Sequence, residues 1–159
     1  MKNIFLLLAA TAMIATSTQK LSAQTSSFKE GEFKQWAQTP PMGWNSWDCY
    51  GSTVTEAETK ANVDYMAANL KSYGWEYIVV DIRWFVENDK AGGYNEMDPI
   101  YVMDQYGRYM PALNRFPSAK DGKGFKPLAD YVHSKGLKFG IHIMRGIPKE
   151  AVAKKLPIK

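Results

Sequence analysis

A helix followed at once by a run of β-branched residues is the feature that most limits what this chain can fold into. Thr55 and Glu58 have the spacing of a capping box, in which two side chains satisfy backbone N–H groups at the start of a helix. Apolar residues then recur at helical spacing, at positions 63, 66, 67 and 70. Gly74 can end the helix in the left-handed conformation.

The run YIVVDI at 77–82 comes directly after that glycine and predicts a strand. Its apolar residues are continuous rather than alternating, which is typical of a parallel strand buried on both faces. Further strands are predicted at 42–47 and 137–144, and further helices at 125–135 and 148–153. The resulting order, β-α-β-α-β-α, is that of βαβ units over a parallel sheet.

Two architectures fit this order. One is a small doubly wound sheet of three strands, and the other is a (β/α)8 TIM barrel of which this chain holds the first three βα units. A complete barrel needs roughly 200 residues or more, so in that case the chain is expected to be an incomplete, truncated barrel. Residues 85–124 lack periodicity, and connections of that length are usually functional or carry small strands.

The N-terminus has the three regions of a secretory signal peptide. Lys2 is followed by an apolar stretch at 4–15 and by small residues that end at Ala23. The apolar stretch is shorter than the roughly 20 residues that span a bilayer. We therefore expect a signal peptide at 1–23, a mature leader at 24–38, and export to the periplasm or the cell exterior. An uncleaved interfacial anchor and a buried strand are the alternatives.

Charge and cysteine content exclude several classes of protein. The formal net charge is +4, two of the positive charges being Lys2 and Lys20 of the expected signal segment, so no nucleic-acid partner is indicated. Cys49 is the single cysteine, which excludes an internal disulfide, and it is interpreted as a buried thiol. His133 is expected to be solvated, and it shares no zinc-ligand spacing with His142. No cofactor or metal is predicted.

Polar or aromatic residues stand where each predicted strand stops, and in β/α barrels functional groups occupy the carboxyl ends of the strands. Trp47 follows the first strand, Asp81 and Trp84 the second, and His142 the third. Asp81 can accept hydrogen bonds from two sugar hydroxyls, and Trp47 offers a flat ring to the C–H face of a sugar. His142 can donate to a hydroxyl. These four are the candidate substrate-binding residues.

Each candidate also has a structural alternative. Asp81 could pair with Arg83 or Arg145 instead of a ligand. Trp47 could belong to the core, and His142 could be a hydrogen-bonded rim residue. The stretch around Trp47 is not a nucleophile elbow, because the second glycine of that motif is missing.

The motifs resemble the opening of glycoside hydrolase family 27, the α-galactosidases and their relatives. The matching segments, in order, are TPPMGWNSW at 39–47, YGWEYIVVD at 73–81, YG at 106–107, NRFP at 114–117, GFKPLA at 124–129 and GLKFGIH at 136–142. The resemblance implies a (β/α)8 barrel that removes terminal α-linked galactose with retention of configuration. It also implies a carbohydrate substrate, while the short N-terminal apolar stretch predicts no stable membrane span.

In such retaining enzymes two carboxylates lie roughly 5–5.5 Å apart. The resemblance places them after the fourth and sixth strands, so no catalytic residue is expected among the three strands of this chain. Trp47 and Asp81 match the galactose contacts of the family. The chain is then a fragment that is inactive alone. A non-catalytic fragment or a sugar-binding module is the alternative.

The chain departs from the family pattern near the sugar pocket. Ile82 stands where the family commonly has a second Asp, and His142 stands where a Tyr is often found. The early cysteines of many members are absent. These differences leave open a relative that acts on β-L-arabinopyranosides or on another glycoside.

Overall fold

The computed structural model describes residues 31–143 and 146–157. The chain divides into two units, 1–38 and 39–159. The described part of the first unit contains one short 3-10 helix, η1 (Glu32–Gln35). The predicted signal peptide and residues 24–30 lie outside the described residues.

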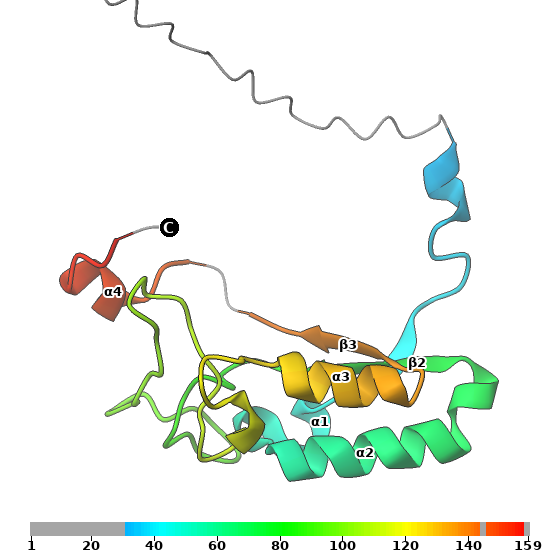
Figure 1. The fold of residues 1–159 in the computed structure, drawn as a ribbon, viewed down its shortest axis with the longest axis horizontal. Coiled ribbons are helices and arrows are strands. Elements are labelled where there is room, and N and C mark those ends of the chain that lie inside the picture. Colours follow the sequence, from blue (N-terminus) through cyan, green and yellow to red (C-terminus); the bar gives the residue numbers. More distant parts are fainter. Residues whose placement is uncertain (1–30, 144–145, 158–159) are drawn as a thin grey trace, which may run out of the picture. The chain divides into compact units, whose positions relative to one another are not determined.

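The second unit is built on a parallel sheet whose order is β1-β2-β3. Its strands are β1 (Met42–Asn45), β2 (Trp75–Val80) and β3 (Lys138–Ile141). The connecting helices are α2 (Glu56–Asn69) and α3 (Lys126–Ser134). The short elements are α1 (Trp47–Tyr50), η2 (Gly51–Thr53), η3 (Lys71–Tyr73), η4 (Pro117–Ala119) and α4 (Lys149–Ala153). The predicted alternation of strands and helices is confirmed (Figure 1).

Helix α2 begins as its sequence predicts. The Thr55 N–H donates to Glu58 Oε2 at 2.8 Å, and the Glu58 N–H donates to Thr55 Oγ1 at 3.3 Å, which completes the capping box. The helix ends one short turn earlier than expected, because η3 separates it from Gly74. That glycine has φ 89°, the left-handed conformation predicted for it.

Helices α2 and α3 lie side by side and cover one face of the sheet (Figure 1). The Tyr131 hydroxyl of α3 lies 2.7 Å from the Asp64 carboxylate of α2. Beneath the helices, a row of side chains crosses the three strands in register. This row is Trp44, Ile78 and Phe139, and it packs with Val63, Met66, Val132 and Leu137 into one core cluster.

The opposite face of the sheet is open in the described residues, so the prediction of a strand buried on both faces is wrong for β2. Gly43, Tyr77 and Lys138 form one register row on that face, and Tyr77 is 37% exposed. Lys138 and Ile141 of β3 are exposed as well. Within β2 itself, only Ile78 and Val80 are therefore buried, on the side that the helices cover.

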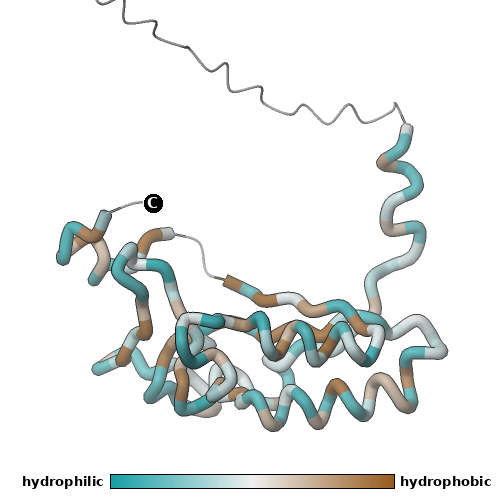
Figure 2. Tube along the Cα trace, viewed as in Figure 1, coloured by the Kyte–Doolittle hydropathy of each residue, from teal (hydrophilic) through white to brown (hydrophobic). Residues whose placement is uncertain are grey.

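The segment between β2 and α3 is irregular, as expected, but it is packed. It contributes Trp84, Phe85, Val86 and Phe116 to a second core cluster, together with Leu128 of α3. Isolated β-bridges join Val86 to Tyr101 and Met103 to Tyr109, in place of the small strands that its length suggested. Figure 2 shows hydrophobic and hydrophilic residues mixed along this segment.

Three local expectations need correction or refinement. Cys49 is exposed rather than buried, and it belongs to the short helix α1, none of whose residues is buried. Strand β3 ends at Ile141, earlier than residue 144, and β2 ends at Val80, so that Asp81 stands just beyond its strand. His133 is exposed, as predicted.

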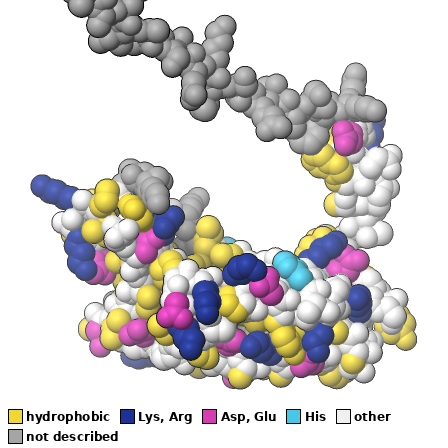
Figure 3. Space-filling view, in the orientation of Figure 1, with side chains coloured by type: hydrophobic (Ala, Val, Ile, Leu, Met, Phe, Trp, Pro, Cys, Tyr) yellow, Lys and Arg dark blue, Asp and Glu magenta, His cyan; other side chains and the backbone are white. Residues whose placement is uncertain are grey.

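The helix-covered side carries charges of both signs. Figure 3 shows basic and acidic side chains interspersed on the face in view. Lys126 pairs with Asp130 at 2.6 Å along α3, and Lys135 pairs with Asp64 at 2.8 Å between the two helices. Such exposed pairs contribute little to stability individually. Because acidic and basic side chains are interspersed, the described residues of this face form no patch of purely positive or purely negative charge.

Candidate functional site

The carboxyl ends of the three strands lie next to one another because the strands are parallel and adjacent in the sheet. The Ser46 N–H donates to Val79 O at 3.0 Å, and the His142 N–H donates to Val80 O at 2.9 Å. These bonds carry the sheet pairing past the end of each strand. Residues that follow β1, β2 and β3 are thereby brought to one edge, where barrel enzymes place their functional groups.

Asp81 is the centre of this edge. It is 8% exposed, and its N–H donates to Ser46 Oγ at 2.9 Å. Its Oδ1 accepts the Ile82 N–H at 2.6 Å and lies 3.1 Å from His142 Nδ1. Within the described ranges, Oδ2 has no hydrogen-bond partner. The carboxylate is thus oriented through one oxygen and leaves the other for a ligand.

Asp81 does not pair with Arg83, which was one structural alternative for it. The Arg83 guanidinium instead binds Asp89. The second suggested partner, Arg145, lies outside the described residues. The partner that the structure provides is His142, whose side chain is 56% exposed. The structure therefore brings two of the predicted site residues into contact.

Trp47 begins α1, directly after the first strand end. Its N–H donates to Asn45 Oδ1 at 2.8 Å, which fixes the backbone where strand turns into helix. Trp47 is 39% exposed, so it is not a core residue. Its ring centroid lies 5.8 Å from that of Tyr94, a residue of the long segment after β2.

Trp84 is packed into the core, unlike the exposed Trp47 and His142. It is 4% exposed, and its ring packs edge-on against Phe85 and Phe125. Its indole N–H donates to His142 O at 3.0 Å. Trp84 therefore holds the backbone just after β3 in place through this hydrogen bond, from the core side. Its role as a direct sugar contact stays a prediction.

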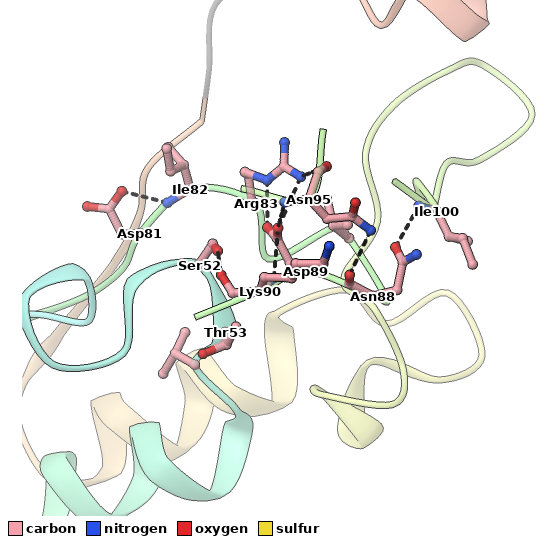
Figure 4. A network of polar contacts seen from close by, with 12 residues as sticks. Ser52, Thr53, Asp81, Ile82, Arg83, Asn88, Asp89, Lys90, Asn95 and Ile100 are labelled. Atoms are coloured by element: carbon pink, nitrogen blue, oxygen red, sulfur yellow. Dashed lines mark hydrogen bonds and ion pairs between the residues drawn. The ribbon is translucent and has the colours of Figure 1, made fainter. Parts of the chain in front are cut away.

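A polar network that the sequence did not reveal adjoins this edge (Figure 4). Arg83 has φ 68°, a left-handed conformation that is uncommon outside glycine. Its Nε lies 2.5 Å from Asp89 Oδ2, and its Nη2 donates to Asp89 Oδ1 at 3.1 Å and to Asn95 O at 2.8 Å. The guanidinium also lies over the Tyr94 ring, 4.8 Å from the centroid. Arg83 thus clamps the 89–95 turn against the strand ends.

Asp89 is the charged partner of Arg83 in this network, and its side chain is fully buried. Burial alone raises the pKa of a carboxyl. Hydrogen bonds from the Arg83 guanidinium and from the N–H groups of Asn95 and Lys90 outweigh it, so the pKa of Asp89 lies below its ordinary value. The carboxylate therefore stays ionised near neutral pH and keeps the clamp closed.

Arg115 holds the same region from the core side. Its Nε and Nη2 donate to Val54 O at 3.1 and 3.0 Å, and its Nη1 donates to Arg83 O at 3.0 Å and to Val86 O at 2.9 Å. Burial lowers the pKa of Arg115 to about 10, so it is still protonated near neutral pH. The NRFP motif was the available signal for this residue, but a motif does not show which carbonyls it meets.

The part of the chain that the structure describes contains no cluster of side chains that could bind a metal ion. There, no three His, Cys, Asp or Glu side chains gather closely enough to hold an ion. Asp81 and His142 are a pair without a third such partner. In the same part of the chain, no helix has the length and apolarity needed to cross a bilayer.

Several known proteins are similar to this chain, although no protein-family model matches it. Alpha-galactosidase A from Cellvibrio japonicus (strain Ueda107) is 41% identical over 123 residues, which are 77% of this chain and 25% of that protein. An alpha-galactosidase from Cyamopsis tetragonoloba is 36% identical over 121 residues, 76% of this chain and 24% of that protein. The chain therefore spans about a quarter of the length of these curated relatives.

Among solved structures, a family 27 β-L-arabinopyranosidase from Geobacillus stearothermophilus in complex with arabinose is 64% identical. The match has a TM-score of 0.75 and covers 78% of this chain and 28% of that one. The chain has parallel strands that alternate with helices, and polar groups follow the carboxyl ends of the strands. Together with this likeness, these features define part of an α/β barrel of a carbohydrate-active class. The chain belongs to glycoside hydrolase family 27 and corresponds to the first part of the family's barrel.

Proposed function

We propose that the complete protein is a retaining exo-glycosidase that releases a terminal sugar of galactose configuration. The observation that carries this proposal is Asp81, a nearly buried carboxylate with one oxygen oriented by the protein and the other without a partner among the described residues. Trp47 stands exposed on the neighbouring strand end. A carboxylate beside an aromatic ring suits a sugar, which has hydroxyls at its edge and C–H groups on its face.

Asp81, His142 and Trp47 each have a separate task in this proposal. Asp81 Oδ2 accepts a hydroxyl hydrogen of the sugar. His142 Nδ1 lies against Asp81 Oδ1, so its Nε2 is the ring nitrogen left to contact a second hydroxyl. Trp47 packs against the C–H face of the ring. Together these contacts select the terminal sugar and fix its orientation.

Ile82 favours β-L-arabinopyranosides over α-D-galactosides. L-arabinopyranose has the ring configuration of galactose but lacks the hydroxymethyl group. Ile82 directly follows the sugar-binding carboxylate and is 7% exposed, and it offers no hydrogen bond to a hydroxymethyl group. The 64% identity to the Geobacillus stearothermophilus β-L-arabinopyranosidase supports the same choice. The α-galactosidase hypothesis is supported by the curated relatives.

The substrate choice is tested with the product of the complete gene on aryl β-L-arabinopyranoside and aryl α-D-galactoside. We expect kcat/KM to be about tenfold higher for the arabinopyranoside, a ratio that one side-chain contact can produce. Ile82→Asp should shift this ratio toward the galactoside, whereas Ile100→Asp, at a position 52% exposed, should not. Turnover of neither substrate, with turnover of some other glycoside, would refute the proposal.

Residues 24–159 alone are proposed not to hydrolyse glycosides. Retaining hydrolysis needs two carboxylates roughly 5–5.5 Å apart. The family resemblance places them after a fourth and a sixth strand, and the described residues form three strands. The purified 24–159 segment should show no release of aryl alcohol above the buffer rate, and hydrolysis by this segment would contradict the assignment.

Calorimetry of the same segment with galactose separates an inert fragment from a sugar-binding module. Binding of galactose indicates a sugar-binding module, and no binding indicates an inert fragment.

A further inference from the structure

Two exposed aromatic rings from distant parts of the sequence form one surface beside the strand ends. Trp47 of α1 is 39% exposed and Tyr94 is 40% exposed. Their ring centroids lie 5.8 Å apart, with 47° between the ring planes. Both rings line a cleft of about 580 Å³ whose remaining walls come from residues 48–53 and 91–93. This volume is within the usual range for sites that bind small molecules.

The position of Tyr94 is fixed by its neighbours rather than by its own burial. The Arg83 guanidinium lies over the ring, 4.8 Å from its centroid, and Asp89 holds that guanidinium through two hydrogen bonds. The next residue, Asn95, is 2% exposed and donates its backbone N–H to Asp89 Oδ1 at 2.8 Å. A bridge between Lys90 and Gly93 closes the turn that leads to the ring. Figure 4 shows this clamp. The ring is exposed but held in place, which is the condition for binding a ligand without a large ordering cost.

The cleft is distinct from the position of the terminal sugar. Asp81 does not line it, although Trp47 does. A sugar whose hydroxyl is accepted by Asp81 therefore uses Trp47 but not the Tyr94 side of the cleft. Asp48 also lines the cleft and offers a carboxylate to further hydroxyls. The chemistry of this wall, aromatic with a polar rim, is that of a pyranose site.

We propose that Tyr94 extends the aromatic surface begun by Trp47 and binds a second pyranose ring, the one linked to the terminal sugar held by Asp81. Arg83 is the positioning residue that keeps Tyr94 beside Trp47. This inference rests on the proposed glycosidase function and adds to it a preference for disaccharides and longer glycosides over glycosides with a small aglycone.

The experiment compares two substrates with the product of the complete gene, a methyl glycoside and a disaccharide with the same terminal sugar. Tyr94→Ala should raise KM for the disaccharide about tenfold, the loss of one ring contact, with kcat unchanged. The methyl glycoside should be turned over as by wild type. Tyr94→Phe keeps the ring and should restore the disaccharide KM. Arg83→Lys keeps a cation beside Asp89 but removes the planar group that lies over Tyr94, and it should reproduce the selective rise in KM.

The matched control is Tyr65→Ala, a tyrosine 62% exposed on α2, which should leave both substrates unaffected. An equal loss on both substrates after Tyr94→Ala would mean that the ring only supports the fold, and no loss on either would mean that it binds nothing. Both results overturn this inference and leave the proposed function intact. No turnover of either substrate by the wild-type protein would overturn the proposed function and this inference with it.

Discussion

Asp81→Asn is expected to reduce kcat/KM of the complete gene product by about a hundredfold or more. The amide keeps an acceptor for the Ile82 N–H, so the turn after β2 is retained. The atom in place of Oδ2 becomes a donor, which cannot accept a sugar hydroxyl. The charge that strengthens this hydrogen bond is lost as well. Steady-state kinetics on the preferred aryl glycoside measure the effect.

The control for this variant is Asp130→Asn. Asp130 is an exposed carboxylate of α3 that pairs with Lys126, so its loss should leave activity unchanged. Thermal unfolding should be the same for both variants and wild type, because the Asp81 N–H still donates to Ser46 Oγ. Full activity of Asp81→Asn would remove Asp81 from the sugar site, and with it the main support for the proposed function.

Arg115→Met is expected to lower the free energy of unfolding by about 3 kcal/mol or more. The carbonyls of Val54, Arg83 and Val86 would lose donors from a residue that is only 8% exposed, and methionine supplies none. Buried carbonyls without donors cost about 1–3 kcal/mol each. Urea unfolding followed by far-UV circular dichroism measures the change.

Arg108→Met serves as the matched control for this loss. Arg108 is an arginine of the same segment, but its side chain is 64% exposed and its partner is the nearby Asp104. Surface substitutions of this kind change stability by about 0.5 kcal/mol or less. Equal stability of the Arg115 and Arg108 variants would show that the carbonyl contacts of Arg115 do not hold the segment after β2.

The parts of the fold that the sequence predicted are those with short-range causes. The capping box of Thr55 and Glu58 and the left-handed Gly74 act within a few residues, so their pattern is visible in the chain itself. The order of strands and helices follows from the same local signals. Burial on both faces was predicted wrongly for β2, since the pattern of residues 77–82 does not show which partners cover each face.

The site was predictable to the extent that it depends on strand order. Asp81 and His142 are far apart in sequence, but each follows a strand, and parallel neighbouring strands bring their ends together. Tyr94 was missed as a site residue because no periodic pattern marks it, and Arg83 was named as a possible partner of Asp81 rather than of Asp89. The irregular segment that contains them is positioned by side-chain contacts, including those of Asp89 and Arg115.

The sequence by itself determined that this chain forms β-α-β-α-β-α, that polar groups follow each strand, and that it resembles glycoside hydrolase family 27. Local propensity, capping and motif order act through near neighbours, so these properties did not need coordinates. Only the tertiary structure decided that Asp81 contacts His142 through one oxygen, that Trp84 is buried, and that Tyr94 lies beside Trp47. Those facts depend on contacts between residues distant in sequence, and such contacts exist only once the packed chain has placed both partners.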